Sequence, residues 1–176
     1  MVLTGSNFIL RRWEVGDAPS LRKNGNDERV SSMLLDRFPA PYTLEDAEAF
    51  INLKIPEEPV TNFALEIEGE VAGVIGVDMR ADIYRKTPLL GYWISPTFSG
   101  KGIMTEAVKL IADYAFSNLD VICIQANTLG NNIASMRVLE KAGFKKQGIL
   151  TASVIKNGLI LDECIYTLHP PKTKSR

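Results

Sequence analysis

The sequence has few of the residues that hold disulfide-linked, metal-binding or membrane-spanning proteins together. It contains two cysteines and one histidine in 176 residues. Cys123 and Cys164 stand far apart and outside any CxxC or Cys/His spacing, so we interpret both as small buried hydrophobic residues. Met1 to Trp13 lack the apolar core of a signal peptide, and no apolar run approaches the length of a membrane span. We therefore expect a cytoplasmic protein with no metal site and no membrane contact.

An excess of charge of one sign is also missing. The formal net charge is −1, from 20 basic and 21 acidic residues, and no long basic run is present, which argues against nonspecific nucleic-acid binding. With 45% hydrophobic residues, the chain suits one soluble domain with a sizeable core. We expect this domain to span residues 1–169 and residues 170–176, which begin Pro170-Pro171 and continue as a polar basic run, to form a disordered tail.

One stretch, Leu90 to Ala107, has the composition of a phosphate-binding loop. An apolar and aromatic run typical of a buried strand is followed by a proline, two glycines and a helical apolar pattern. Glycines leave no side chain to obstruct a ligand, and the unpaired amides at a helix N-terminus attract anions. Lys101 adds a positive charge and Thr105 a hydroxyl. The parts of this pattern are the run Leu90–Ile94, Pro96, Gly100, Gly102 and the helical pattern from Ile103.

The alternative is a tight strand-to-helix turn in which glycine serves only the backbone conformation. Two familiar phosphate motifs do not fit the stretch. The nucleotide P-loop requires a glycine where Ser95 stands and a hydroxyl where Gly102 stands. The dinucleotide fingerprint requires a glycine at Thr105 and an acidic residue at the end of the next strand, where Gln125 and Asn127 stand.

The stretch resembles the acetyl-CoA pyrophosphate motif of the GNAT superfamily of N-acetyltransferases. Its lead-in, Gly91-Tyr92-Trp93-Ile94-Ser95-Pro96, and its exit, Thr105-Glu106-Ala107, are similar to the RimJ/RimL type, which acetylates N-terminal amines of ribosomal proteins. A second block, Asn132-Ile133-Ala134-Ser135-Met136-Arg137-Val138-Leu139-Glu140-Lys141-Ala142-Gly143-Phe144, resembles the same type. The resemblance covers most of the chain and is weakest between about Trp13 and Val60. The family motif usually has Gln or Arg where Ser99 stands and Gly or Ala where Met104 stands.

The resemblance implies a fold, a cosubstrate and a set of contacts. The fold is a single α/β GNAT-like domain, with a mixed central sheet of about seven strands and about four helices, splayed at the acetyl-CoA site. The protein is expected to be a monomer or a homodimer. Asn127 and Asn132 have an alternative interpretation as plain turn or cap residues. The residues assigned to acetyl-CoA are Trp93, Ile94, Ser99, Gly100, Lys101, Gly102, Ile103, Met104, Thr105, Asn127 and Asn132.

Hydrophobic periodicity places these motifs within a mixed α/β order. Turn residues separate the elements, and a Thr43–Asp46 capping box marks one helix start. Nothing in the chain repeats, and no linker divides it. Strands are predicted near residues 8–12, 62–66, 71–79, 89–94, 121–126, 144–154 and 159–168, and helices near 18–25, 44–54, 103–116 and 132–143.

Attack of a neutral amine on a thioester sets three chemical tasks: stabilising the oxyanion, protonating the leaving thiolate and deprotonating the amine. The resemblance gives the first task to backbone amides near Trp93 and Ile94, where the central strand splays from its neighbour. Ser135 is the candidate proton donor. If Asn132 is the cap, Ser135 lies in the first helical turn, whose dipoles stabilise a developing thiolate. A serine in the RimJ/RimL type has this role, and the alternative is a second cap or a solvated hydroxyl.

No residue is an evident base for the third task, the deprotonation of the amine. Many relatives have a glutamate two residues before the glycine of the Gly-Tyr-Trp motif, and here that position holds Leu89, which takes no proton. A water chain, or Asp78 or Glu66 on neighbouring strands, would have to replace it. Because carboxylates are mostly exposed, these two acids have an alternative interpretation as solvated strand residues.

The sequence leads to the hypothesis of an acetyl-CoA-dependent N-acetyltransferase that acts on a primary amine in a ternary complex. An unperturbed lysine amine, with a pKa of about 10.4, is neutral in well under about a thousandth of molecules at pH 7, whereas an α-amine is neutral in roughly a tenth. A site without an evident base is thus better matched to α-amines, in agreement with the RimJ/RimL resemblance. The alternatives are a non-catalytic acyl-CoA-binding module and a polyamine or aminoglycoside acetyltransferase.

Overall fold

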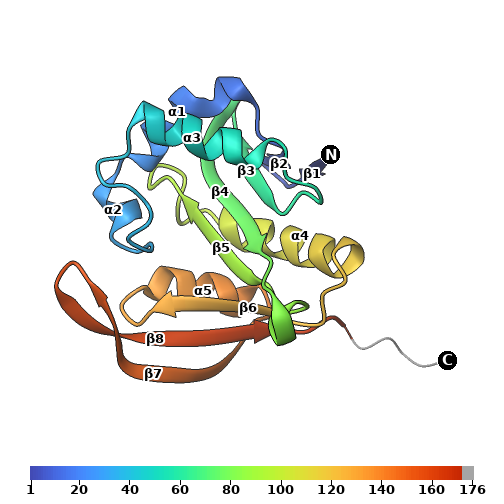
Figure 1. Cartoon of the computed structure of the whole chain (residues 1–176), viewed down its shortest axis with the longest axis vertical. Coiled ribbons are helices and arrows are strands. Elements are labelled where there is room, and N and C mark those ends of the chain that lie inside the picture. The colour runs from blue at the N-terminus through green and yellow to red at the C-terminus, as the bar shows by residue number, and fades with distance from the viewer. Residues whose placement is uncertain (172–176) are drawn as a thin grey trace.

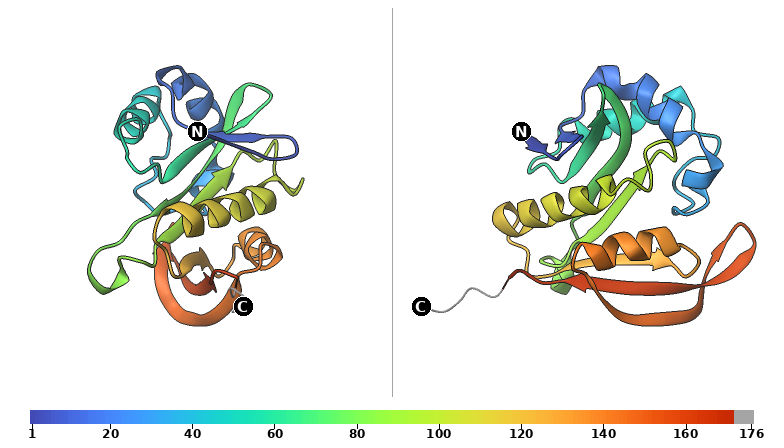
Figure 2. Two further views of the ribbon diagram at one scale, coloured as in Figure 1. Left: turned by 90° about the vertical axis from the view of Figure 1, so that its right-hand side faces the viewer. Right: turned by 180° about the vertical axis from the view of Figure 1, so that it is seen from behind.

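The chain folds around one eight-stranded sheet with the order β1-β2-β3-β4-β5-β6-β8-β7. A computed structural model describes residues 1–171. Helices α1 and α3 cover one face at the N-terminal end of the sheet, and α4 and α5 lie on the other face (Figures 1 and 2). The strands are β1 (Val2–Thr4), β2 (Ile9–Arg11), β3 (Asn62–Ile67), β4 (Glu70–Asp78), β5 (Leu89–Ile94), β6 (Ile124–Leu129), β7 (Lys145–Lys156) and β8 (Leu159–Leu168).

Local capping explains where the longer helices begin. In α3 (Leu44–Lys54), the Thr43 hydroxyl accepts from the Asp46 N–H and the Asp46 carboxylate accepts from the Thr43 N–H, at 3.2 and 2.9 Å. Asn132 caps α5 (Ile133–Lys141). The other helical segments are η1 (Val15–Asp17), α1 (Ala18–Gly25), α2 (Glu28–Ser31), η2 (Asp82–Tyr84) and α4 (Ile103–Asn118).

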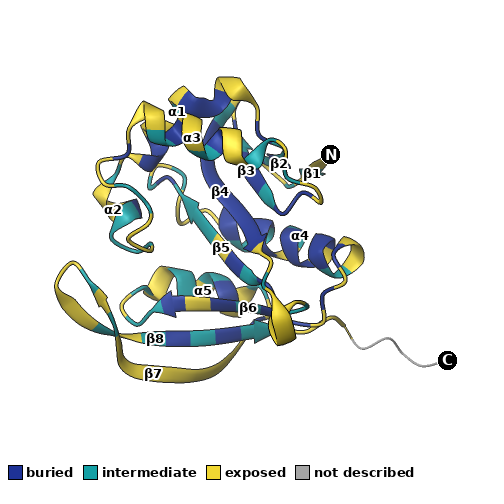
Figure 3. Cartoon of the chain, in the orientation of Figure 1, coloured by how far each residue is buried: buried dark blue, intermediate teal, exposed yellow. Residues whose placement is uncertain are grey.

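The core has two parts, one on each face of the sheet (Figure 3). Strand β4 contributes to both because successive side chains point to opposite faces. Val74 packs with Leu21 of α1 and Ile51 of α3, whereas Ile75 packs with the α4 side, including Ile111. Almost every residue of β4 is buried. This strand is therefore the fixed element beside which β5 and the site are placed.

The sheet splits between β5 and β6. These neighbours run parallel but have a single pair in register, Leu89 with Gln125. The Gln125 N–H donates to the Pro88 carbonyl at 3.0 Å, and beyond this point the strands diverge (Figure 1). All other neighbouring strands pair antiparallel. The splay expected from the sequence is therefore present, and it opens toward the C-terminal ends of both strands.

The predicted α/β fold is confirmed. The differences concern two short elements, β1 and α2, and the start of β6. The sheet has eight strands because β1 adds a three-residue strand that the sequence prediction missed, and the single turn of α2 was also missed. The strand predicted at 121–126 begins only at Ile124, because its pairing with β8 begins there, with Leu168, and Ile122 is exposed. Of the predicted tail 170–176, residues 172–176 lie outside the described residues. None of the described helices is long and apolar enough to cross a membrane.

Candidate active site

The glycine loop forms an open cradle at the start of α4. Gly100 and Gly102 have φ values of 76° and 79°, a left-handed conformation that favours glycine. A Cβ added at either position would meet no atom within 4 Å, so both backbones face open space. Gly102 is also the N-cap of α4 and no side chain caps this end, which leaves the first amides without an intrahelical partner. A pyrophosphate fits such a cradle, because exposed amides and the helix dipole both favour an anion.

The side chains of the cradle contribute less than its backbone. Ile103 and Met104 are buried in the core, so only their backbone amides are directed to the cradle. The exposed Ser99 hydroxyl donates to the Pro96 carbonyl at 3.0 Å. The Lys101 ammonium lies 5.6 Å from the centre of the Phe98 ring and remains exposed. The departures from the family motif at positions 99 and 104 thus leave the backbone donors in place.

The first turn of α4 is also held by the N-terminal hairpin. The Glu106 carboxylate accepts hydrogen bonds from the Ser6 N–H and hydroxyl, at 2.9 and 3.0 Å. Thr105, one residue earlier, is half-buried. Because Glu106 is engaged with the turn between β1 and β2, its carboxylate has partners other than the cradle amides.

The edge of β5 supplies a backbone donor to the splay. Antiparallel pairs alternate between hydrogen-bonded and non-hydrogen-bonded. Ser95 N–H donates to Ala72 at 2.7 Å, so the alternation makes Trp93–Val74 a bonded pair and Ile94–Gly73 a non-bonded one. The Trp93 amide is thus directed to β4, whereas the Ile94 amide is directed toward the gap. Of the two amides that the sequence analysis named, Ile94 is the one that faces the splay.

Ser135 lies in the first turn of α5, on the far side of the gap. Its N–H donates to the Asn132 carboxamide oxygen at 3.2 Å, which places it at the positive end of the helix dipole. Its Oγ lies 2.8 Å from the Tyr92 hydroxyl of β5. The Ser135 carbonyl is a second, longer acceptor for the single Tyr92 hydroxyl proton, at 3.3 Å. The hydroxyl pair therefore bridges the two elements that the splay separates.

Tyr92 keeps its proton at neutral pH. Burial raises its pKa to about 12, against a smaller opposing effect of the hydrogen bond with Ser135. The sequence analysis assigned no role to Tyr92. The alternation of side chains along a strand predicts that Tyr92 and Trp93 face opposite sides of β5. It does not predict the contact between Tyr92 and Ser135, which are 43 positions apart.

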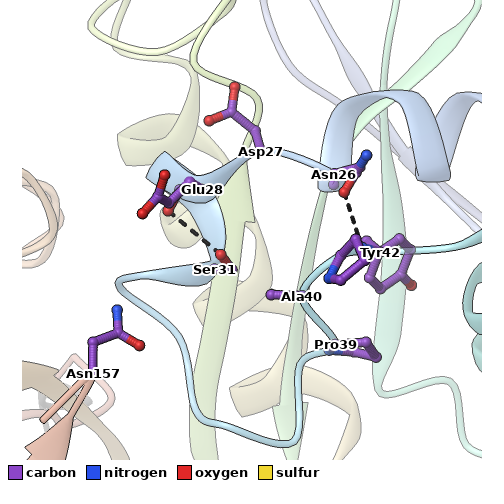
Figure 4. Close-up of a pocket in the computed structure, with 10 residues that line it drawn as sticks. Asn26, Asp27, Glu28, Ser31, Pro39, Ala40, Tyr42 and Asn157 are labelled. Atoms are coloured by element: carbon purple, nitrogen blue, oxygen red, sulfur yellow. Dashed lines mark hydrogen bonds between the residues drawn. The ribbon is translucent and has the colours of Figure 1, made fainter.

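On the other face of β5, Trp93 packs behind a polar cavity. A Cβ added at Gly25 would lie 3.3 Å from the Trp93 ring, and the Phe38 ring stacks on Tyr42 and meets Trp93 edge-on. The adjoining cavity has a volume of about 430 Å³ (Figure 4). Its lining residues are Gly25, Asn26, Asp27, Glu28, Ser31, Pro39, Ala40, Pro41, Tyr42 and Asn157.

Acidic and amide groups surround this cavity from two parts of the chain. Asp27 and Glu28 come from the start of α2, and Asn157 comes from the tip of the β7–β8 hairpin (Figure 4). Hydrogen bonds from Arg29 lower the pKa of Asp27, so it is anionic. Glu28 has no ion-pair partner within residues 1–171. None of these residues was predicted from the sequence to belong to the site, because only the fold brings α2 and the hairpin together.

Neither alternative base is free among the described residues. The Glu66 carboxylate accepts from the Arg11 guanidinium at 2.5 Å, and Arg11 also pairs with Asp17. Asp78 pairs with Arg37 at 3.0 Å and lies opposite Leu89. At about 3.3 Å per residue, Asp78 is about 10 Å along β4 from Ile75, the residue that pairs with Tyr92. Neither Glu66 nor Asp78 is therefore an unpaired carboxylate at the hydroxyl pair.

The two asparagines assigned to the cosubstrate differ in their contacts. Asn132 is the N-cap of α5, and its carboxamide is used by the Ser135 amide. Asn127 on β6 accepts from Gln125 at 2.9 Å and donates to Glu163 at 3.2 Å. Asn127 is exposed, so it also has surface open to a ligand.

Comparisons with known proteins show which family and which folds the chain resembles. The family model for the acetyltransferase (GNAT) domain matches residues 7–145. The probable N-acetyltransferase YjcK of Bacillus subtilis is 33% identical over 180 residues, covering 97% of this chain and 98% of that protein. The spermidine N(1)-acetyltransferase of Escherichia coli is 29% identical over 127 residues, covering 69% and 65%. The solved structure of RimL, a ribosomal L7/L12 alpha-N-protein acetyltransferase in complex with coenzyme A, matches with a TM-score of 0.84 at 18% identity, covering 96% and 98%.

Proposed function

The chain belongs to the GNAT family of acetyltransferases, and from this premise we propose that it acetylates the α-amine at the N-terminus of a protein or peptide. The resemblance seen in the sequence is confirmed, and acetyl-CoA is the cosubstrate. The choice of an α-amine as the acceptor rests on one observation about the carboxylates near the site. Glu66 and Asp78 are each paired with an arginine, and Leu89 stands where many relatives have a glutamate.

A site whose two strand carboxylates are both paired with arginines favours an amine that is already neutral. About a tenth of unperturbed α-amines are neutral at pH 7, compared with well under about a thousandth of lysine amines. The difference is roughly two orders of magnitude in reactive acceptor. An α-amine therefore needs only water to take up its surplus proton after attack.

The proposed site divides the remaining tasks among residues of the splay. The amides from Gly100 to Met104 hold the pyrophosphate, together with the charge of Lys101. The Ile94 N–H stabilises the oxyanion that forms on the thioester carbonyl. Ser135 gives a proton to the sulfur as the carbon–sulfur bond breaks, with the α5 dipole favouring the developing negative charge. The amine loses one proton and the thiolate gains one, so the reaction is balanced.

The cavity beside Trp93 is the proposed entry for the acceptor. Its Asp27 and Glu28 carboxylates attract a cationic N-terminus, and its amides at Asn26 and Asn157 suit a peptide backbone. A polyamine is the second candidate acceptor. The spermidine acetyltransferase among the relatives and the same two carboxylates favour it, because a polyamine is a multiple cation.

A competition assay tests the choice. Equal concentrations of a short peptide with a free N-terminal Ala or Ser, the same peptide blocked at its N-terminus but containing lysine, and spermidine are incubated with the protein and acetyl-CoA. Mass spectrometry then locates the acetyl group. We expect the free N-terminus to be labelled fastest. Label mainly on lysine would refute the preference, and label mainly on spermidine would select the second candidate.

A further inference from the structure

The position of the Ser135 hydroxyl depends on Tyr92. The hydrogen-bond partner that the described residues give Ser135 Oγ is the Tyr92 hydroxyl, at 2.8 Å. A serine in a first helical turn otherwise has several ways to bond to nearby backbone groups, or it points to solvent. Here the contact comes from β5, across the gap between the strands. Tyr92 thus selects one orientation of Ser135, directed at the space where β5 and α5 face each other.

We propose that Tyr92 is a positioning residue for acetyl transfer, which orients the Ser135 hydroxyl and passes it a proton as Ser135 protonates the leaving sulfur. This inference rests on the proposed function. It extends the site from one hydroxyl to a coupled pair. It also gives the Tyr of the Gly91-Tyr92-Trp93 segment a role distinct from that of its neighbour Trp93, which faces the acceptor cavity.

The proton and electron balance of the step is complete within the reaction. When the tetrahedral intermediate collapses, the carbon–sulfur bond breaks and its electron pair stays on sulfur. The Ser135 Oγ proton moves to sulfur, and the Tyr92 hydroxyl proton moves to Ser135 Oγ. The acetylated nitrogen has one surplus proton, which returns to Tyr92 through solvent. Both hydroxyls are therefore restored after each turnover.

The surroundings of Tyr92 suit a donor. Its ring packs against the core on the α4 side of the sheet, which fixes the hydroxyl, and burial raises its pKa to about 12. The hydroxyl is therefore protonated throughout the neutral range. Serine alone would have to become an alkoxide, whereas with Tyr92 behind it the species left is a phenolate, which is the more stable of the two anions although burial disfavours it.

The competing explanation is that Tyr92 only ties β5 to α5. Tyr166 provides a matched control for this explanation. It is a buried tyrosine on the same side of the sheet, near enough to contribute to the raised pKa of Tyr92, and its hydroxyl donates to the Glu140 carboxylate at 3.1 Å rather than to Ser135. Removing either hydroxyl costs one half-buried hydrogen bond, so both changes should affect stability, but only the Tyr92 hydroxyl is hydrogen-bonded to Ser135.

The test is a double-mutant cycle in steady-state kinetics with acetyl-CoA and an acetylatable peptide. We expect Tyr92→Phe to lower kcat about tenfold or more while the KM for acetyl-CoA changes less than about twofold. Tyr166→Phe should leave kcat within about twofold. The double variant Tyr92→Phe with Ser135→Ala should be no slower than Ser135→Ala alone, because the two hydroxyls act as one unit.

Three outcomes overturn the proposal: an unchanged kcat in Tyr92→Phe, equal losses in Tyr92→Phe and Tyr166→Phe, or a double variant whose loss is the product of the single losses. An inactive wild-type protein would instead contradict the proposed function. If Tyr92→Phe does not fold, a fluorinated tyrosine at position 92 keeps the hydroxyl but makes it more acidic. Its kcat should then fall as the pH rises through the pKa of the fluorophenol, and the absence of this fall would overturn the proposal.

Discussion

At the scale of single residues, the proposed binding of CoA depends on a glycine backbone that no side chain covers. Gly102 has a left-handed conformation, faces open space and is the cap of α4. We expect Gly102→Val to weaken CoA binding strongly in calorimetry, because its side chain would stand where the pyrophosphate approaches. Lys101→Ala should cost less, about one kcal/mol or below, since one exposed charge contact is lost.

The chain offers a matched control for the Gly102 substitution. Gly69, in the β3–β4 turn, has a φ of 81° and also faces open space. Gly69→Val introduces the same backbone strain far along the chain from the cradle, so it should lower stability without changing CoA affinity. Equal CoA affinity in the Gly102 and Gly69 variants would show that the cradle is misplaced.

At the scale of elements, the β7–β8 hairpin contributes Asn157 to the proposed acceptor cavity, on the side of α2 (Figure 4). Its Lys156 pairs with Asp36 at 2.8 Å, next to Asn157, which lines the cavity. Lys156→Met keeps the aliphatic stem but removes the ion pair. Because such pairs contribute about 1 kcal/mol or less, we expect the KM for the acceptor to rise about two- to fivefold, with the KM for acetyl-CoA unchanged.

Lys86→Met is the control for the hairpin variant. Lys86 forms an ion pair of the same length with Asp120, at the closed end of the splay. Its loss should leave both KM values unchanged in the same steady-state assay. A rise in the acetyl-CoA KM in the Lys156 variant, or equal acceptor effects in both variants, would contradict the assignment of the cavity to the acceptor.

Elements whose signals are local were predictable from the sequence, and those that depend on distant partners were not. The α3 start follows from Thr43 and Asp46, three residues apart, and the α5 start from Asn132. The start of β6 was predicted three residues early, because a strand begins only where a partner is present, and the first partner is Leu168 of β8, which pairs with Ile124. An apolar run by itself carries no such information.

The same distinction applies to the candidate site. The glycine loop is contiguous, so its form was readable from spacing alone. The Tyr92–Ser135 contact joins residues 43 positions apart, and the cavity joins α2 to Asn157, near the other end of the chain. Only the completed fold fixes these distances. Both cysteines are buried, as the sequence indicated.

At the scale of the whole molecule, the split sheet makes one site from two walls. The wall formed by β5 and α4 carries the Ile94 amide and the cradle, and the wall formed by β6 and α5 carries Ser135. Tyr92 joins the two walls by a hydrogen bond of 2.8 Å. The proposed acceptor cavity lies on the opposite face of β5, beside Trp93. The two substrates would thus meet at β5 from different sides, as direct transfer in a ternary complex requires.

A crystal structure of the protein with CoA bound tests this central claim most directly. The account predicts that the pyrophosphate oxygens accept hydrogen bonds from the amides between Gly100 and Met104, and that the CoA sulfur lies within about 4 Å of Ser135 Oγ. The pantetheine arm should run between β5 and β6. A pyrophosphate outside the cradle, or a sulfur beyond reach of the Tyr92–Ser135 pair, would contradict it.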